Sequence, residues 1–306
     1  MSAISELRHL GGKTKSDKRD DKAAFLFLLP WFIGLFAVTA GPMVASLWLS
    51  TTKYNLLQPP VFIGLENFVR MLTDARLHKS LGVTFTYVLV SVPLQLAFAL
   101  ALAVLLDRGV RGLSFYRSVY YLPSLIGGSV AIAVLWRTVF GVEGLFNDFL
   151  AMFGIDGQGW ISNPDTALWT LIVLNVWTFG APMVIFLAGL RQIPGSYYEA
   201  AGVDGASRWR QFWSITMPLL SPIIFFNLVL QIIHSFQSFT QAFVVSGGTG
   251  GPADSTLVFS LYLYQRGFGA FDMGYASALA WLLVVIIGAF TAINFWASKY
   301  WVFYDD

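Results

Sequence analysis

Six long apolar segments constrain this chain more than any other feature of its sequence. Each is long enough to cross about 30 Å of hydrocarbon as a helix. A single segment in lipid can pair all of its own backbone N–H and C=O groups only as a helix. Of the 306 residues 56% are hydrophobic and 12% charged, which excludes an ordinary soluble enzyme. The sequence therefore predicts an all-α polytopic membrane protein with six transmembrane helices, at residues 23–50, 82–106, 118–139, 167–190, 218–243 and 274–298.

The first apolar segment follows a basic stretch, as the core of a signal peptide would. The run over residues 23–50 is far longer than such a core, so it is interpreted as a retained span behind a flexible cytoplasmic tail, residues 1–22. The letters GGKT at residues 11–14 resemble the end of a phosphate-binding loop. The first glycine of that loop and the strand before it are missing, so no nucleotide site is predicted. We expect kinks or helix ends at the prolines, Pro30, Pro42, Pro93, Pro123 and Pro182.

Basic residues set the orientation, because they collect on the cytoplasmic side of a membrane. If the N-terminus is inside, thirteen Lys and Arg fall on the cytoplasmic side and five on the outer side, with Arg137 at a boundary. The loop over residues 141–166 has four acidic residues and no basic one, as expected outside. Both termini are therefore predicted to be cytoplasmic, together with the loop over residues 191–217.

That cytoplasmic loop carries its own folding signals. Ser196 and Glu199 have capping-box spacing, which predicts a helix start just after Pro194. The pair Asp204-Gly205 predicts its end, since glycine accepts the left-handed conformation and aspartate suits the N-cap of a following helix. A second helix is expected from about residue 206 to Pro218.

The same loop resembles the EAA loop of permease subunits in bacterial ATP-binding-cassette (ABC) importers. Glu199-Ala200-Ala201 is followed by Gly205 and then by Ile215, Met217 and Pro218 at the family's intervals, with Met217 in place of leucine. FIGLENF at residues 62–68, YYLP at residues 120–123 and GGP at residues 250–252 are similar to further elements of the carbohydrate-uptake branch, the maltose and glycerol-phosphate type. The resemblance covers residues 24 to about 300.

The resemblance implies a type I importer permease fold in the bacterial plasma (inner) membrane. It also implies the partners: a second homologous permease, two cytosolic ATP-binding subunits, an extracytoplasmic solute-binding protein and a carbohydrate substrate. ATP and Mg would be used by the ATPase, with no cofactor bound by this chain and no enzymatic activity of its own. By resemblance the ATPase contact would involve Glu199, Ala200, Ala201, Gly202, Asp204, Gly205, Ala206 and Arg208.

The fifth apolar segment carries a polar stripe. Its members are spaced 4, 3, 4 and 3 residues apart, which places them within about 80° of one helix face. Hydrogen bonding between helices would explain such a stripe; lining of a translocation path would explain it too, because polar groups in a membrane face water, solute or another helix. The candidate path residues are Asn227, Gln231, His234, Ser238 and Gln241, with Asn175, Trp177, Thr178 and Gln95 as weaker candidates.

The spans contain no Asp, Glu or Lys. Ion-coupled carriers place carboxylates near the membrane midplane, so an ion-coupled secondary transporter of a small neutral solute is the less favoured alternative. A membrane enzyme would need a clustered catalytic set and a passive channel would not need the capped loop. The three histidines are scattered and cysteine is absent, so no metal site is predicted. Disaccharides, longer oligosaccharides, polyols and glycerol phosphate all stay open as substrates.

Overall fold

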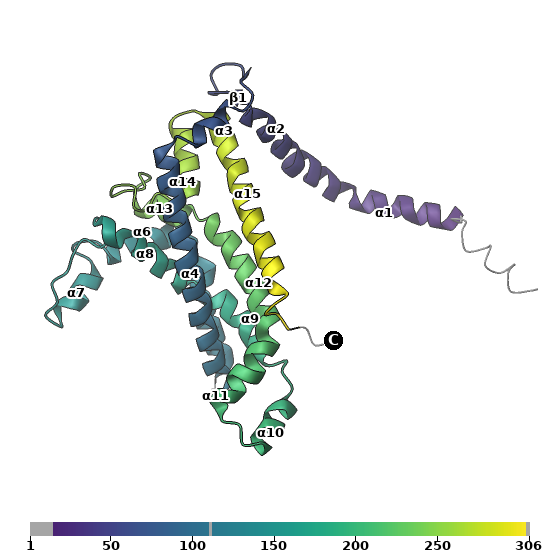
Figure 1. Cartoon of the computed structure of the whole chain (residues 1–306), viewed down its shortest axis with the longest axis vertical. Helices are drawn as coiled ribbons and strands as arrows, with labels where there is room; N and C mark the ends of the chain where they lie inside the picture. Colours follow the sequence, from purple (N-terminus) through teal and green to yellow (C-terminus); the bar gives the residue numbers. More distant parts are fainter. Residues whose placement is uncertain (1–14, 110–111, 304–306) are drawn as a thin grey trace, which may run out of the picture.

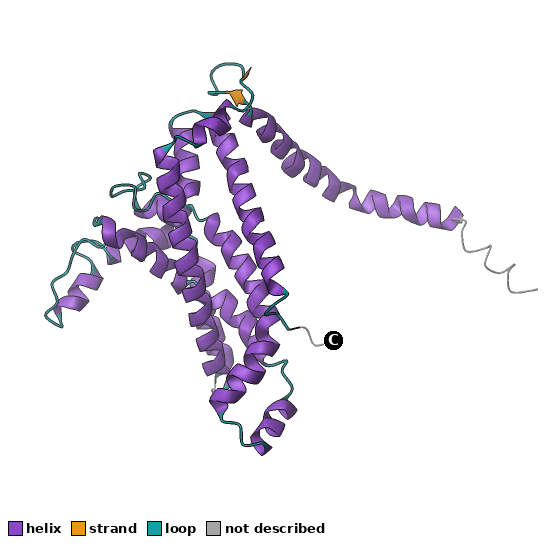
Figure 2. Cartoon of the chain, in the orientation of Figure 1, coloured by secondary structure: helices purple, strands orange, loops and turns teal. Residues whose placement is uncertain are grey.

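A computed structural model describes residues 15–109 and 112–303 of the chain. Helices make up nearly all of its regular structure (Figure 2). The exception among the described residues is a two-stranded antiparallel ribbon of β1 (Thr52–Lys53) and β2 (Val61–Phe62), in which Thr52 pairs with Phe62. Helices make up most of each of the six predicted apolar segments, although the segments at 118–139, 167–190 and 218–243 each contain a break.

Four helical stretches are long and apolar enough to cross a membrane. They are Ala24–Ser50, Ala75–Asp107, Arg208–Val245 and Met273–Ser298. Two further pairs of helices pass the same test together but are bent, Leu113–Ile126 with Val130–Val139 by 95° and Pro164–Trp177 with Gly180–Leu190 by 41°. The number of spans is therefore four, or six if each bent pair crosses once.

The stretches are built from the following elements. The first consists of α1 (Lys15–Gly34), the π-helical turn η2 (Leu35–Ala40) and α2 (Gly41–Ser50). The second is α4 (Ala75–Asp107), and the last is α15 (Met273–Ser298). The bent pairs are α5 (Leu113–Ile126) with α6 (Val130–Val139) and α8 (Pro164–Trp177) with α9 (Gly180–Leu190). The remaining long stretch joins α11 (Arg208–Gln211), η3 (Phe212–Thr216), α12 (Met217–Phe236) and α13 (Thr240–Val245).

Short helices lie in the connections. These are α3 (Glu66–Met71), α7 (Leu145–Ala151), α10 (Gly195–Val203), α14 (Phe259–Tyr264) and the π-helical turn η4 (Gln265–Gly269). In α3 the Asn67 side chain is buried and donates to the carbonyls of Ser50 and Thr52, each at 2.9 Å. The asparagine of the FIGLENF segment thus ties the loop to the end of α2.

Helix α4 runs through the centre of the bundle and packs against α8, α9, α12 and α14 (Figure 1). Lipid removes the hydrophobic drive between helices, so small residues and close approach decide their packing. Ala99 and Ala103 of α4 are fully buried. A Cβ on Gly180 would lie 2.2 Å from the Tyr120 carbonyl oxygen, which shows how closely α9 approaches α5.

The first helical stretch leaves the bundle (Figure 1). No residue is buried in the most apolar 18-residue window of Ala24–Ser50. Helix α2 packs along α15, and the Trp281 indole donates to the Ser46 hydroxyl at 3.2 Å. The described residues therefore leave most of this arm, the apolar stretch from residue 24 of α1 to the end of α2, uncovered.

Three expectations about these segments are corrected. The tail was expected to be flexible to residue 22, but α1 begins at Lys15, and residues 1–14 with their GGKT letters lie outside the described residues. The 118–139 segment is not one straight helix, because Ser129 adopts extended backbone and caps α6 through the Ile132 N–H at 3.3 Å. Pro30 and Pro93 lie inside unbroken helices, whereas Pro42 and Pro182 lie in the first turns of α2 and α9.

Charged residues cluster at one end of the bundle, called here the Asp74 end. Arg70 pairs with Asp272 at 2.7 Å, and Arg76 makes a two-pronged pair with Asp254 at 2.7 and 3.0 Å. Asp74 itself caps α4 by accepting from the Arg76 and Leu77 N–H groups, both at 3.1 Å. These contacts link α3 to the start of α15, and the start of α4 to the loop before α14.

The Asp74 carboxylate is only 8% exposed and is surrounded by donors. It accepts from the hydroxyls of Tyr262 and Tyr275, the latter at 2.8 Å, and Arg266 lies 3.5 Å away. Burial alone would raise the pKa of Asp74, but these bonds outweigh it and hold that pKa below its ordinary value. Burial raises the pKa of Tyr262 to about 12, so its hydroxyl remains a donor.

Candidate coupling loop and translocation path

The polar loop between α9 and α12 forms a short helical hairpin at the opposite end of the bundle (Figure 1). Its first helix, α10, begins at Gly195, with Pro194 as a N-cap that makes no side-chain bond. The predicted helix start just after Pro194 is confirmed, but the capping box of Ser196 and Glu199 that was expected to form it is wrong. Pro194 has extended backbone, and its missing N–H costs nothing at the start of a helix. The helix therefore begins at Gly195, and Ser196 lies inside it rather than at its N-cap.

The end of α10 follows the sequence prediction closely. Gly205 has a φ of +76°, the left-handed conformation that glycine accepts without strain. The Ala206 N–H bonds the Ala201 carbonyl at 2.9 Å, and the Gly205 N–H bonds the Gly202 carbonyl at 3.0 Å. This pair of bonds is the Schellman motif, so the predicted stop at Asp204-Gly205 is confirmed.

The second helix of the hairpin differs from its prediction at both ends. Its N-cap is Ser207, whose hydroxyl accepts from the Arg210 N–H at 3.4 Å, and not Asp204. It also continues through Pro218 into α12. The π-helical turn η3 lies directly before this proline, and its Met217 N–H bonds the Phe212 carbonyl. The wider turn lets the helix pass a residue that would otherwise break it.

Contacts fasten the hairpin to the bundle while leaving its tip open. The Tyr198 and Thr216 hydroxyls bond at 2.9 Å, which joins α10 to η3. At its start, Arg191 lies 3.5 Å from Asp107 at the end of α4. Of the eight predicted contact residues, Ala201 and Ala206 are half-buried, and the exposed ones are Glu199, Ala200, Gly202, Asp204, Gly205 and Arg208.

The predicted path residues do not share one helix. Helix α12 ends at Phe236, and residues 237–239 separate it from α13, so Ser238 and Gln241 lie beyond the break. The stripe over one continuous helix face is therefore wrong. Ser238 donates to Gln241 at 3.5 Å, and Gln241 donates to the Gly127 carbonyl at the bend between α5 and α6 at 3.4 Å.

The residues on α12 also differ among themselves. Asn227 is buried and donates to the Ile223 carbonyl of its own helix at 3.0 Å, which favours a structural role. Gln231 is half-buried and His234 is exposed. These two remain open to a path or to a neighbouring chain.

A cluster of hydrogen-bonded polar side chains occupies the bend between α8 and α9. The Gln95 amide donates to the carbonyl and hydroxyl of Thr178 at 3.1 and 2.9 Å. Ser124 donates to the same carbonyl and accepts from the Ala181 N–H, both at 2.8 Å. Sequence reasoning missed Ser124, because nothing in the sequence distinguishes it from the other two serines of α5.

Two buried polar atoms of this region have no hydrogen-bond partner among the described residues. In the part of the chain that the structure describes, the Gln95 carbonyl oxygen and the Asn175 amide nitrogen are buried and make no hydrogen bond. Buried polar atoms without partners are costly, so these two atoms have unused capacity to bond water or solute. The described residues hold no group of three or more His, Asp or Glu that could bind a metal ion.

Comparison with known proteins decides the family. Residues 76–300, most of the chain, match the family described as the inner membrane component of binding-protein-dependent transport systems. The chain belongs to this family. It is a multi-pass membrane permease, and the family resemblance seen in the EAA loop is confirmed.

Several relatives match over nearly their whole length. A probable ABC transporter permease, YesP of Bacillus subtilis (strain 168), is 54% identical over 96% of both chains. The lactose transport permease LacF of Rhizobium radiobacter is 32% identical over 91% of this chain and 95% of its own. The trehalose/maltose permease MalF of Thermococcus litoralis is 30% identical over 92% and 95%.

Solved structures match the fold. A chain of a bacterial ABC transporter that imports the acidic polysaccharide alginate superposes with a TM-score of 0.80 at 24% identity, over 93% of this chain and 97% of that one. The same transporter type in complex with its alginate-bound periplasmic protein gives a TM-score of 0.82 at 23% identity, over 94% and 98%. At this identity the likeness establishes an importer permease fold and nothing finer.

Proposed function

We propose that this chain is one permease subunit of an ATP-driven, binding-protein-dependent carbohydrate importer, coupled to a cytosolic ATPase through residues 191–217. The observation that carries the proposal is the hairpin of α10 and α11. Its tip is exposed and built on a rigid Schellman turn, while Tyr198 and Arg191 fasten its base to η3 and α4. A force applied at the tip would therefore reach the transmembrane helices.

Carbohydrate as the substrate class rests on two supports. Relatives named for lactose and for trehalose/maltose transport align with almost the whole chain. Four polar side chains near the helix breaks, Gln95, Asn175, Gln231 and Gln241, are amides, which donate and accept hydrogen bonds without carrying charge. Such groups suit a neutral polyhydroxyl solute.

Both termini in the cytoplasm and six spans are part of the proposal. Arg191 meets Asp107, so the two loops predicted to be cytoplasmic share one end of the bundle. The Phe303 N–H bonds the Ser221 hydroxyl near the start of α12, which brings the C-terminal segment to that same end. Arg70 and Asp272, from two loops predicted to be outside, meet at the other end.

The partners follow from the same reasoning. The uncovered arm of α1 and α2 supports a second permease subunit, against which its apolar side chains would pack. Two ATP-binding subunits would receive the hairpin and use ATP with Mg. An extracytoplasmic solute-binding protein would dock at the Asp74 end; the alginate transporter that shares the fold was solved with a periplasmic protein.

Site-directed cross-linking tests the proposal. The chain has no cysteine, so Val203→Cys, at an 89% exposed position on the hairpin, introduces a unique thiol. We expect it to form a disulfide or short bifunctional cross-link with the co-expressed ATPase. Val61→Cys, at a 61% exposed position on the Asp74 side, is the matched control and should not cross-link. Cross-linking to the ATPase from Val61→Cys but not from Val203→Cys would contradict the coupling role and the orientation together.

A further inference from the structure

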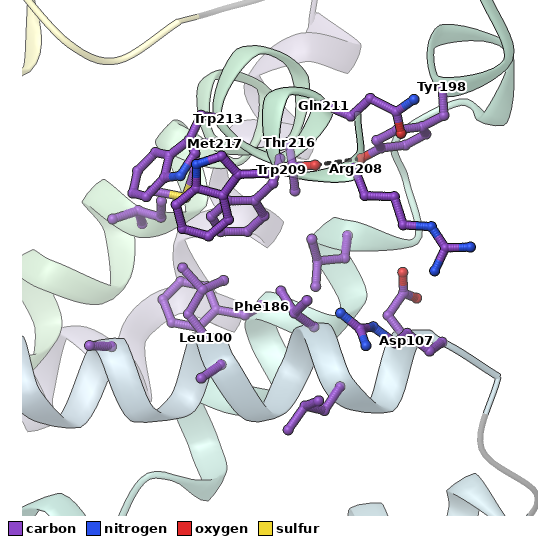
Figure 3. Close-up of a pocket in the computed structure, with 18 of the residues that line it drawn as sticks. Leu100, Asp107, Phe186, Tyr198, Arg208, Trp209, Gln211, Trp213, Thr216 and Met217 are labelled. Atoms are coloured by element: carbon purple, nitrogen blue, oxygen red, sulfur yellow. Dashed lines mark hydrogen bonds between the residues drawn. The ribbon is translucent and has the colours of Figure 1, made fainter. Parts of the chain in front are cut away.

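An apolar groove of about 860 Å³ lies beside the hairpin (Figure 3). One wall is the last third of α4, with Ala97, Leu100 and Ala101. The other wall is the second helix of the hairpin, with Trp209 and Trp213, and Phe186 of α9 contributes from the side. Small alanines on α4 leave the space that the groove occupies.

The groove has the length of one membrane leaflet. Its α4 wall extends from Leu96 to the C-cap Arg108, thirteen residues or about 18 Å along the helix axis. Half of the hydrocarbon core measures about 15 Å. A single acyl chain of one leaflet would thus fit along the groove, with its headgroup at the Asp107 end.

Charge is concentrated at that same end. Arg108 and Arg208 line the groove beside Asp107, which is paired with Arg191. Figure 3 shows the Arg208 side chain reaching toward the end of α4 where Asp107 lies. Three arginines with one aspartate make this mouth of the groove positive, which complements an anionic headgroup.

Aromatic side chains mark the level of the interface. Trp209 and Trp213 are 71% and 51% exposed, although they lie in a helix that continues into the membrane. Indoles gather at the headgroup level of a bilayer. Their position next to Arg208 places the mouth of the groove at the boundary between hydrocarbon and water.

We propose that this groove binds the acyl chain of an anionic phospholipid from the cytoplasmic leaflet, with its headgroup held by Arg108 and Arg208. The inference rests on the orientation given under the proposed function. A lipid seated there contacts both α4 and the second helix of the hairpin, so it fills the gap between the coupling element and the bundle. The lipid would thereby stiffen the link through which the hairpin moves the transmembrane helices.

Quenching of tryptophan fluorescence by brominated lipids tests the proposal on the assembled complex in vesicles. The probes are phosphatidylglycerol and phosphatidylcholine with identical dibrominated acyl chains. Subtracting the signal of a Trp209→Phe, Trp213→Phe double variant isolates the two groove indoles from the other tryptophans. We expect quenching at lower mole fraction with phosphatidylglycerol. Arg108→Gln should lower that apparent affinity about fivefold, the ~1 kcal/mol that one arginine contributes near a charged surface.

Matched variants separate the groove from general membrane effects. Ala101→Leu fills the groove and should reduce quenching by both lipids, whereas Leu94→Phe, on an exposed position of α4 outside it, should not. Arg117→Gln, an exposed arginine on α5 outside the groove, should leave the headgroup preference intact. Equal quenching by the two lipids, or an unchanged preference in Arg108→Gln, would overturn the proposal. Indoles that neither lipid reaches in the complex would mean that a partner helix covers the groove, which also overturns it.

The readout is independent of transport. ATP-driven uptake measured in the same vesicles distinguishes the two claims. If uptake is ATP-driven but quenching shows no headgroup preference, the lipid site is wrong and the proposed function stands. If quenching shows the preference but there is no ATP-driven uptake, the proposed function is wrong and the lipid site stands.

Discussion

At the scale of single residues, Glu199 carries the most direct test of the coupling role. It is exposed on α10 and does not cap the helix, so its substitution should not disturb the fold of the hairpin. Glu199→Lys reverses the charge that the ATPase would meet. We expect sugar uptake by the reconstituted complex to fall about tenfold or more, the effect of ~1.4 kcal/mol at one contact, while ATP hydrolysis continues.

The control for Glu199 is the same reversal at the other end of the bundle. Glu66 is also exposed, in the first turn of α3. Glu66→Lys should leave the ratio of uptake to ATP hydrolysis unchanged. Normal coupling in Glu199→Lys would remove this residue from the ATPase contact.

Asp74 has the opposite role, because it is buried and structural. Asp74→Asn would remove the charge that Tyr262, Tyr275 and Arg266 surround and would leave donors without full partners. A loss of about 1–3 kcal/mol of stability is expected, measured as a lower melting temperature of the purified protein. Ser46→Ala, which removes one partly buried neutral hydrogen bond to Trp281, should have a much smaller effect.

The pH dependence of that stability has a definite sign. Hydrogen bonds hold the pKa of Asp74 below its ordinary value, so its contribution is fully present above an unfolded pKa of about 3.9. The difference in melting temperature between the protein and Asp74→Asn should be constant from pH 5 to 8. It should shrink as pH falls below about 4. A difference that grew toward acidic pH would contradict the assigned network.

At the scale of elements, the hairpin depends on one backbone conformation. Gly205→Pro replaces a residue at φ +76° with one fixed near −65° and removes the N–H that bonds Gly202. The turn should open and coupling should be lost, while the protein still reaches the membrane. Gly195→Ala is the control, since that glycine has ordinary helical geometry and open space around it. Full transport by Gly205→Pro would show that the turn is dispensable.

The breaks between helices locate the proposed path. Gln231→Cys should react with a water-soluble thiol reagent in the assembled complex if this half-buried amide faces the passage. Phe226→Cys, on a 53% exposed position about 140° around the same helix, should face lipid and stay unlabelled. The reverse labelling pattern would assign the path to another face of α12.

Elements that depend on local sequence signals could be predicted, whereas those that depend on contacts between distant parts of the chain could not. The apolar segments were located because length and hydrophobicity suffice for helices in lipid. The end of α10 was found because Gly205 is a local signal. The 95° bend at Ser129 and the passage through Pro218 were missed, because each depends on backbone bonds to neighbouring turns. The cluster at Asp74 was also missed, since its partners lie about 200 residues apart in the chain.

At the scale of the whole molecule, the two ends of the bundle differ in kind. Ion pairs and tyrosine hydroxyls clamp the Asp74 end, whereas the Asp107 end carries an exposed hairpin beside an open groove. The six apolar segments predicted from the sequence hold no Asp, Glu or Lys for an ion-coupled cycle. The difference between the two ends, together with the uncovered arm of α1 and α2, favours a subunit whose helices move when partner subunits act on it.

Uptake by reconstituted vesicles tests that central claim most directly. The chain, its partner permease and the ATPase are placed in proteoliposomes with the solute-binding protein and radiolabelled carbohydrate on the outer face. The account predicts concentrative uptake only when the ATPase and internal ATP are both present. Accumulation of the sugar by this chain alone, driven by an ion gradient and without any ATPase, would contradict it.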